Sequence, residues 1–301
     1  MSYISVDEKW ASSALTKRPS ESNKGSFGRV LAHVGSTDYI GAMYLSVEAM
    51  LRGGAGYIEL SAEREIGFMA LNKFPEILYR PLPKNDQLTD DDIAQLISYQ
   101  KRSSSTLIGC GCGVSENLKK LTLALIRAEG GTLIIDADAI NSLALDRRAA
   151  FDALACAERD IILTPHPLEF SRLFGVSVDA IASDRVGVAE EFARRTASVV
   201  LLKGYGTVIT DGNRTYKNTS GSSALAKAGS GDCLAGLIAS LSASSSGCAV
   251  DIAALGAYIH GAAGDDLSAS YSEYGVTPSD LPRAMAKVMR RLELLRDGGS
   301  F

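Results

Sequence analysis

The sequence lacks any long apolar run. No uninterrupted hydrophobic stretch in the 301 residues approaches the roughly 20 residues that a membrane-spanning helix requires. The opening residues, MSYISVDEKW, contain no basic segment followed by an apolar one, which is the pattern of a secretory signal. We therefore expect a cytoplasmic protein with no membrane partner.

Cysteine is sparse, and the charges are nearly balanced. The five cysteines are scattered and odd in number, which is typical of a reduced protein and not of a disulfide framework. They do not form the paired Cys and His spacings of a zinc site, so we assign no metal ligand. The formal net charge is −4 and no basic, aromatic-rich patch stands out, which argues against a nucleic-acid partner.

The sequence is rich instead in short apolar strands that alternate with helical patterns. β-Branched runs such as RVLAHV, TLIID and SVVLL are separated by stretches such as GAMYLSVEAMLRGGAG and ENLKKLTLALIRAEGG. These two helical patterns end at Gly53–Gly54 and Gly130–Gly131, where glycine can cap a helix. The alternation predicts right-handed βαβ units and a mostly parallel sheet that helices cover on both faces.

One three-layer α/β domain accounts for this pattern. Residues 1–23 are polar and are predicted to be an N-terminal lead-in segment, whereas residues 24–301 form the domain, whose pattern is entirely helical after residue 230. The stretch TVITDGNRTYKN differs because Asp211-Gly212 separates two strand-like runs. It predicts an antiparallel hairpin at or near one edge of the sheet.

Glycines and polar residues follow five strands in succession, in the segments GSTDYIGA, CGCGVS, ADAIN, PHPLEF and GYGT. Because ligands of open α/β sheets bind beyond the carboxyl ends of the strands, we expect the functional site there. GCGCG at 109–113 is either a flexible turn or an imperfect dinucleotide fingerprint. Its third glycine comes one residue early for G-x-G-x-x-G.

His166, Glu169 and Lys203 lie at two of these strand ends. His166 stands between two prolines that fix its backbone, and it either bonds a local carbonyl group or takes part in chemistry. Glu169 falls in the first turn of a helix, where a carboxylate suits the dipole. Lys203 ends one strand and Thr207 begins the next, so both can face a phosphate group, although a surface lysine before a turn gives the same pattern.

The stretch AKAGSGDCLAG holds the most informative residues. Gly229, Ser230 and Gly231 leave backbone N–H groups unobstructed at the start of a helix, where the dipole favours an anion. Asp232 is either a helix N-cap or a base that takes the proton of a hydroxyl group attacking a bound phosphate. Since an N-cap needs no preceding glycines, we favour phosphoryl transfer to a small-molecule alcohol, without the P-loop motif, which the sequence lacks.

Taken in order, these motifs resemble a known family. AGSGDCLAG resembles the G-[ST]-G-D anion-hole motif of the ribokinase-like superfamily. The ordered set KGSFGRVLAHVGSTDYIGA, LRGGAG, GCGCG, IIDADAIN, ILTPHPLEF and LLKGYGTVITDG resembles the ATP/ADP-dependent NAD(P)H-hydrate dehydratases, from about Lys24 to the C-terminal helices. The resemblance implies a ribokinase-like fold and a lyase that repairs hydrated NADH or NADPH. Such an enzyme phosphorylates the ring hydroxyl with ADP or ATP and Mg²⁺, and phosphate then leaves.

The resemblance also implies residue roles. Asp232 is the expected catalytic base. The expected substrate-binding residues are Ala42, Gly113, Asn141, His166 and Asp232, and the expected nucleotide-binding residues are Lys203, Gly204, Tyr205, Gly206, Thr207, Gly229, Ser230 and Gly231. The chain departs from the family pattern at Cys110 and Cys112, which replace a proline and a leucine, and at Leu168, which replaces a glycine. We also expect a homo-oligomer, such as a tetramer, and no epimerase domain in the residues before the match.

Other functions stay open at this stage. A ribokinase-like vitamin or sugar kinase would share Asp232 and its anion hole but would release a stable phosphorylated product. The TPHPLEF and GCGCG segments are not expected in a sugar kinase. A catalytically silent nucleotide-binding protein would not require Asp232 directly after the stretch from Gly229 to Gly231, and NAD-dependent oxidoreduction conflicts with the glycine spacing.

Overall fold

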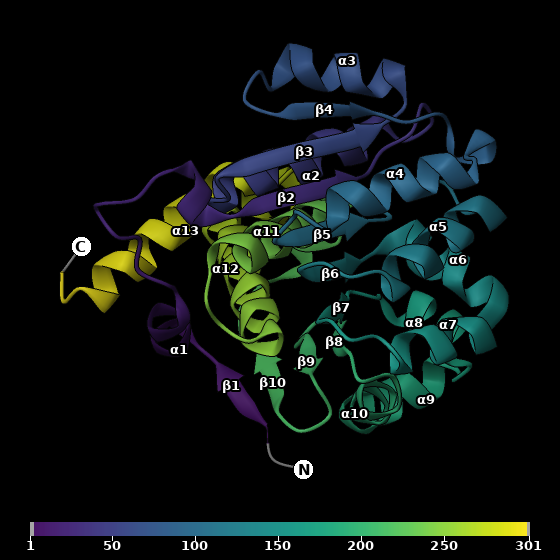
Figure 1. The fold of residues 1–301 in the computed structure, drawn as a ribbon. Helices are drawn as coiled ribbons and strands as arrows, with labels where there is room; N and C mark the ends of the chain where they lie inside the picture. Colours follow the sequence, from purple (N-terminus) through teal and green to yellow (C-terminus); the bar gives the residue numbers. More distant parts are fainter. Residues whose placement is uncertain (1–2, 300–301) are drawn as a thin grey trace.

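The computed structural model describes residues 3–299 and contains a ten-stranded sheet. The strand order across the sheet is β1-β10-β9-β8-β7-β6-β5-β2-β3-β4 (Figure 1). The strands are β1 (Ile4–Val6), β2 (Arg29–His33), β3 (Tyr57–Ala62), β4 (Leu78–Pro81), β5 (Ser105–Ile108), β6 (Thr132–Ile135), β7 (Ile161–Leu163), β8 (Val199–Leu202), β9 (Val208–Thr210) and β10 (Thr215–Asn218).

Helices cover both faces of this sheet. They are α1 (Glu8–Ala14), α2 (Ile40–Gly53), α3 (Arg64–Lys73), α4 (Asp90–Gln100), α5 (Glu116–Arg127), α6 (Ala137–Leu143), α7 (Arg147–Ala155), α8 (Pro167–Phe174), α9 (Val178–Ser183), α10 (Arg185–Thr196), α11 (Ser230–Ser244), α12 (Ala249–Gly275) and α13 (Leu281–Arg296). Residues 3–299 also contain four short 3₁₀ turns: η1 (Lys24–Phe27), η2 (Asn85–Gln87), η3 (Ala144–Asp146) and η4 (Ser223–Leu225).

The pairing of the strands agrees with the sequence-based expectation of a mostly parallel sheet. The exception is β9, which runs antiparallel to both β8 and β10. The hairpin expected from TVITDGNRTYKN is therefore confirmed, and β1 lies beyond it at the edge, parallel to β10. No helix in residues 3–299 is both long and apolar enough to cross a bilayer.

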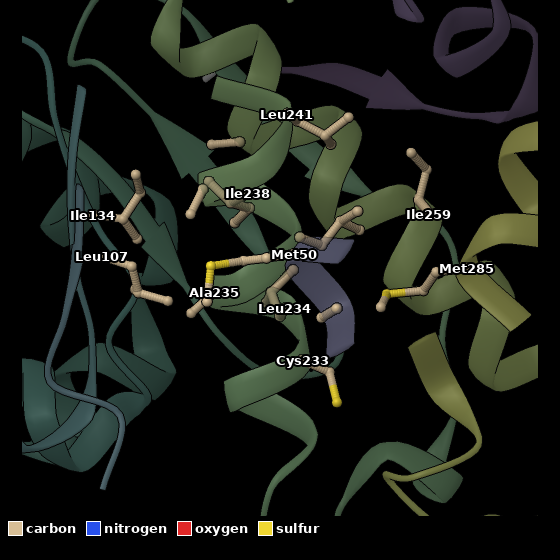
Figure 2. Packing of buried hydrophobic residues seen from close by; sticks show 14 of the residues in the cluster. Met50, Leu107, Ile134, Cys233, Leu234, Ala235, Ile238, Leu241, Ile259 and Met285 are labelled. Atoms are coloured by element: carbon tan, nitrogen blue, oxygen red, sulfur yellow. The ribbon is translucent and has the colours of Figure 1, made fainter. Parts of the chain in front are cut away.

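Two hydrophobic layers sandwich the sheet, because successive strand residues face opposite sides. Leu107 and Ile134 point into one layer and Ile108 into the other. Helices α2, α11, α12 and α13 build the first layer, and Figure 2 shows Leu107 and Ile134 beside Ala235 and Ile238 of α11. The parallel strands are buried on both faces, which explains why their sequences read as continuous apolar runs.

Close packing of α2 against α11 fixes the position of the α11 N-terminus. A Cβ atom at Gly236 would lie 2.4 Å from the Ser46 carbonyl oxygen, and one at Gly53 would lie 2.5 Å from Ser240 Cβ. Only glycine permits this approach at either position. The stretch GSGD is thereby held at the carboxyl edge of the sheet, where the strand ends converge.

The helix ends expected from the glycine pairs are partly wrong. Helix α2 ends as predicted, since Gly54 caps it in the left-handed conformation. Helix α5 ends earlier, at Arg127, and its cap Ala128 is extended. Gly131 instead lets the backbone pass close to Ser104, because a Cβ atom at Gly131 would lie 1.8 Å from the Ser104 carbonyl oxygen.

The segment expected to be a lead-in contributes to the packed structure. Val6 of β1 and Ala11 of α1 are fully buried in the main core. Trp10 packs against Tyr216 of β10 with ring centroids 5.1 Å apart. Residues 4–14 therefore complete one edge of the sheet and its cover.

Candidate active site

The ends of β6, β7 and β8 and the N-terminus of α11 surround a cavity of about 690 Å³. The predicted site residues in its wall are His166, Lys203, Gly204, Tyr205, Thr207, Gly229, Ser230, Gly231 and Asp232. The fold thus brings the two strand-end motifs and the glycine-rich stretch to one place, as the rule for open α/β sheets predicts.

The N-terminus of α11 opens into this cavity with unpaired backbone donors. Gly229 is the N-cap, at a φ of 97°, and Asp232 is the third helical residue. The Ser230 N–H donates to the Lys227 carbonyl oxygen. Within the described part of the chain, the N–H groups of Gly231 and Asp232 have no acceptor. Two free donors at the positive end of a helix dipole make an anion-binding site.

Asp232 does not serve as the helix cap, since Gly229 occupies that position. Its carboxylate instead faces the buried charges at the end of β6. Burial raises the pKa of Asp232 to about 7, the Asp136 carboxylate adds to this rise, and the Lys203 ammonium opposes it. A carboxyl group with a pKa near neutrality can accept a proton efficiently at cellular pH.

Asp136 and Lys203 form a charged pair in the wall of the cavity, and Glu169 lies beside Lys203. Lys203 Nζ lies 2.8 Å from Asp136 Oδ1 and 4.0 Å from Glu169 Oε2. Burial lowers the pKa of Lys203, but the two carboxylates outweigh that effect and the net shift is upward. Asp136 also accepts hydrogen bonds from Thr164 Oγ1 at 2.8 Å and from Cys110 Sγ at 3.5 Å. The ammonium group is therefore held rigidly beside Asp232.

His166 is fixed by the start of α8. Its Nδ1 accepts hydrogen bonds from the N–H groups of Leu168 and Glu169, at 3.1 and 3.3 Å, while Glu169 Oε2 accepts from the His166 N–H at 2.8 Å. This reciprocal capping leaves Nε2 as the ring nitrogen able to carry the proton. Burial, followed by the Lys203 ammonium, lowers the pKa of His166. Leu168, which stands where the family pattern has a glycine, lies in the first turn of α8. A glycine is therefore not needed there to position the His166 ring.

The turn after β8 presents a loop to the cavity. Gly204 and Gly206 have φ values of 146° and 64°, which favour glycine. Thr207 Oγ1 donates to the Gly204 carbonyl oxygen at 2.8 Å and closes the turn. Tyr205 at its tip is 95% exposed. Lys203, Gly204, Tyr205 and Thr207 line the cavity.

Three predicted substrate-binding residues lie outside this wall. Ala42 sits in the first turn of α2, where a Cβ atom on Gly111 would approach its Cβ to 2.5 Å. Gly113 donates its N–H to Asp138 Oδ2 at 2.9 Å and lines a neighbouring cavity. Asn141 of α6 donates from Nδ2 to the Ala137 carbonyl oxygen at 3.2 Å, and its Oδ1 accepts from Arg172 Nη1 at 2.8 Å.

Sequence reasoning assigned no role to Asp136 or His260, which both line the large cavity. The signal for Asp136 was its place directly after a buried strand. His260 lies within the long apolar pattern of α12, and its Nε2 contacts the Ser230 carbonyl oxygen at 3.0 Å and Ser230 Oγ at 3.1 Å. No spacing in the sequence indicates that contact, which depends on how α12 crosses α11.

The acidic groups at the cavity suit a magnesium ion that a nucleotide would bring. Oxygen atoms of Asp136 and Asp232 and the Cys110 sulfur lie within 4.8 Å of one another. Mg²⁺ binds through one or two carboxylates together with phosphate oxygens, whereas a thiol is not among its preferred ligands. The Asp136 carboxylate beside the helix N-terminus fits this requirement, and one carboxylate is enough.

Comparison with known proteins identifies the family. The family model described as NAD(P)H-hydrate dehydratase matches residues 30–287. The chain belongs to this family. A bifunctional NAD(P)H-hydrate repair enzyme of Moorella thermoacetica is 36% identical over 288 residues, which cover 94% of this chain and 53% of that protein. The chain thus spans about half the length of this dehydratase-family relative.

Two further members of the NAD(P)H-hydrate dehydratase family match more of their own length. The ADP-dependent (S)-NAD(P)H-hydrate dehydratase of Neisseria meningitidis is 33% identical, with 84% of this chain and 81% of that protein covered. The Bacillus subtilis ADP/ATP-dependent NAD(P)H-hydrate dehydratase, crystallised with ATP and Mg²⁺, has a TM-score of 0.83 at 27% identity, covering 97% of this chain and all of that one (100%). The predicted three-layer ribokinase-like fold is confirmed.

Proposed function

We propose that the chain dehydrates hydrated NADH and NADPH, using ADP or ATP as the phosphoryl donor. The observation that carries this proposal is the Asp232 carboxylate beside two free N–H groups and a buried ammonium group. Membership of the NAD(P)H-hydrate dehydratase family indicates that the phosphoryl acceptor is a nicotinamide hydrate. A hydroxyl group on the nicotinamide ring is a poor leaving group, and transfer of a phosphoryl group to it creates a good one.

The proposed reaction has two steps. Asp232 takes the proton of the ring hydroxyl, whose oxygen attacks the terminal phosphorus, and the nucleotide departs one phosphate shorter. The C–O bond of the phosphorylated ring then breaks, phosphate leaves, and a proton is lost from the adjacent ring carbon to restore the double bond. The N–H groups at the α11 N-terminus and the Lys203 ammonium stabilise charge on the phosphate oxygens during transfer.

The remaining assignments follow the family motifs. Residues 203–207 and 229–231 would bind the nucleotide, and Ala42, Gly113, His166 and Asn141 would bind the hydrate. Mg²⁺, held by the Asp136 carboxylate together with the nucleotide phosphates, would neutralise phosphate charge and leave the Asp232 carboxylate free to take the proton. We further propose a cytoplasmic homo-oligomer, such as a tetramer. The soluble metabolites on which the family acts support the cytoplasmic location, and the oligomeric state stays a prediction from the sequence resemblance.

The deciding experiment is to incubate the purified protein with hydrated NADH or NADPH, Mg²⁺ and either ADP or ATP. Recovery of the reduced nicotinamide absorbance, dependent on nucleotide, is the expected result. A ribokinase-like kinase would leave the hydrate unchanged and accumulate a phosphorylated vitamin or sugar. That outcome would replace the proposal.

A further inference from the structure

A second cavity, of about 290 Å³, lies at the same edge of the sheet over the ends of β2, β3, β4 and β5. Its wall includes His33, Glu63, Lys84, Asn85 and Gly113. Gly113 is one of the expected hydrate-binding residues, and it lines this cavity and not the larger one. We name this cavity the Glu63 pocket.

The wall of the Glu63 pocket is braced by hydrogen bonds between neighbouring strand ends. His33 Nδ1 contacts the Ser61 carbonyl oxygen at 2.8 Å, and its Nε2 contacts Asn85 Oδ1 at 2.9 Å. Asn85 Nδ2 donates to the Cys112 carbonyl oxygen at 2.8 Å. These contacts link β2, β3, η2 and the loop after β5. The pocket is therefore preorganised and does not depend on a mobile loop for its shape.

Glu63 carries an unused hydrogen-bond acceptor in this wall. The side chain is 8% exposed, and its Oε1 accepts the Thr37 N–H at 2.9 Å. Oε2 is buried and has no hydrogen-bond partner among residues 3–299, as is also true of Ser36 Oγ in the same wall. Buried acceptors without a donor are costly and uncommon in native proteins. A ligand that donates hydrogen bonds would satisfy them.

The charges around Oε2 disfavour a phosphate group as that ligand. Three carboxylates, those of Asp38, Glu63 and Asp86, face one ammonium, that of Lys84. Lys84 Nζ lies 3.6 Å from Glu63 Oε2, an ion-pair distance, and its half-exposed flexible side chain is able to move aside. An excess of negative charge repels phosphate and favours neutral hydroxyl donors.

We propose that the Glu63 pocket binds a ribose diol of the dinucleotide hydrate, with Glu63 accepting hydrogen bonds from its hydroxyl groups. The inference rests on the proposed dehydratase function. β6, β5, β2 and β3 are consecutive neighbours, so Glu63 lies three strand spacings, about 14 Å, from the strand end that bears Asp136. A dinucleotide whose ring reacts at Asp232 extends along this edge, since the opposite direction leads to the nucleotide loop. In other dinucleotide-binding sites, a carboxylate likewise accepts hydrogen bonds from ribose hydroxyl groups.

The first test compares Glu63→Gln with Glu65→Gln, the same change on an exposed neighbour outside the pocket. The amide oxygen that Glu63→Gln introduces still accepts the Thr37 N–H, so the fold is retained. We expect kcat/KM for hydrated NADH to fall at least about tenfold in Glu63→Gln and to stay within about twofold in Glu65→Gln. If the bound diol belongs to the adenosine ribose, kcat/KM for hydrated NADPH does not fall and is expected to rise, because Glu63→Gln removes a carboxylate that repels the phosphate on that ribose. If the bound diol belongs to the nicotinamide ribose, kcat/KM falls by the same factor for hydrated NADH and hydrated NADPH.

The second test measures binding alone, so that it does not depend on turnover. NADH and NADPH are titrated calorimetrically into each variant with Mg²⁺ and a non-hydrolysable ATP analogue saturating the nucleotide loop. A dissociation constant for NADH at least about tenfold higher in Glu63→Gln than in Glu65→Gln supports ribose binding in the Glu63 pocket. If that difference is found but neither hydrate is turned over, only the proposed reaction fails. Equal NADH affinities in the two variants, with hydrates turned over normally by both, would overturn the pocket and leave the reaction standing.

Discussion

Lys203 Nζ and Asp136 Oδ1 lie 2.8 Å apart, and both side chains are largely buried beside Asp232. The pair acts on the proposed base in opposite directions. The Asp136 carboxylate raises the pKa of Asp232, and the Lys203 ammonium lowers it, while burial sets the overall rise to about 7. The pair therefore tunes the pH at which Asp232 can accept a proton.

Opposite changes to this pair should move the pH profile in opposite directions. A base must be deprotonated to act, so activity falls as the pH drops through the pKa of Asp232. Asp136→Asn removes a negative neighbour, lowers that pKa, and is expected to move the acidic limb of kcat/KM down by roughly one pH unit. Lys203→Met removes a positive neighbour and is expected to move the limb up. Limbs that coincide in all three proteins would show that Asp232 does not govern the profile.

Gly231 should tolerate no branched side chain without loss of turnover. A Cβ atom there would lie 3.2 Å from Lys203 Nζ and would project into the anion site. We expect Gly231→Val to fold normally but to lose at least about a hundredfold in kcat, comparable to loss of an oxyanion donor. Gly247→Val, at an exposed position where the new Cβ would make ordinary contact with Ile252 at 3.4 Å, is the control. Equal rates in the two variants would place the phosphate elsewhere.

The sequence predicts the fold where its patterns are long and periodic. The parallel strands are recognised because both faces of the sheet are buried, and the three final helices because α11 and α12 are apolar and α13 is amphipathic. Strands β1 and β4 are not recognised. β1 has three residues, and β4 (LYRP) carries a charge and a proline, as edge strands often do.

The candidate site is only partly predictable, because its electrostatics arise between elements that are distant in sequence. Asp136 and Glu169 each have a local explanation, as the end of a strand and the first turn of a helix. Their shared contact with Lys203 exists only because β6, α8 and β8 converge. Likewise, Ser230 and His260 are 30 residues apart and meet through the packing of two helices.

His260 is expected to hold the anion site in place without touching the substrate. Burial lowers the pKa of His260 to about 4, so the ring is neutral at working pH. Because a carbonyl oxygen only accepts, Nε2–H donates to the Ser230 carbonyl at 3.0 Å and orients the first turn of α11.

His260→Leu should therefore raise the nucleotide KM about tenfold, the effect of one lost hydrogen bond with its acceptor left buried. His260→Gln, which retains a donor, should stay within about threefold of the wild-type protein. Steady-state kinetics at varied nucleotide concentration separate the KM effect from kcat. If both variants show the same KM as wild type, the contact with Ser230 is only a packing feature of the two helices.

Asp232→Asn tests the proposed base directly. Asparagine has nearly the same shape and accepts a hydrogen bond, but its amide cannot take a proton from the ring hydroxyl. Replacement also removes a buried carboxylate whose pKa is raised by burial, so the fold should not be weakened. We expect melting close to wild type, retained nucleotide binding, and a kcat lower by about 10²–10⁴-fold, or roughly 3–5 kcal/mol of barrier. The melting temperature, nucleotide affinity and kcat are measured on one preparation. A folded, nucleotide-binding variant with near-normal kcat would mean that another group takes the proton, and Glu169, beside Lys203, would be the next residue to test.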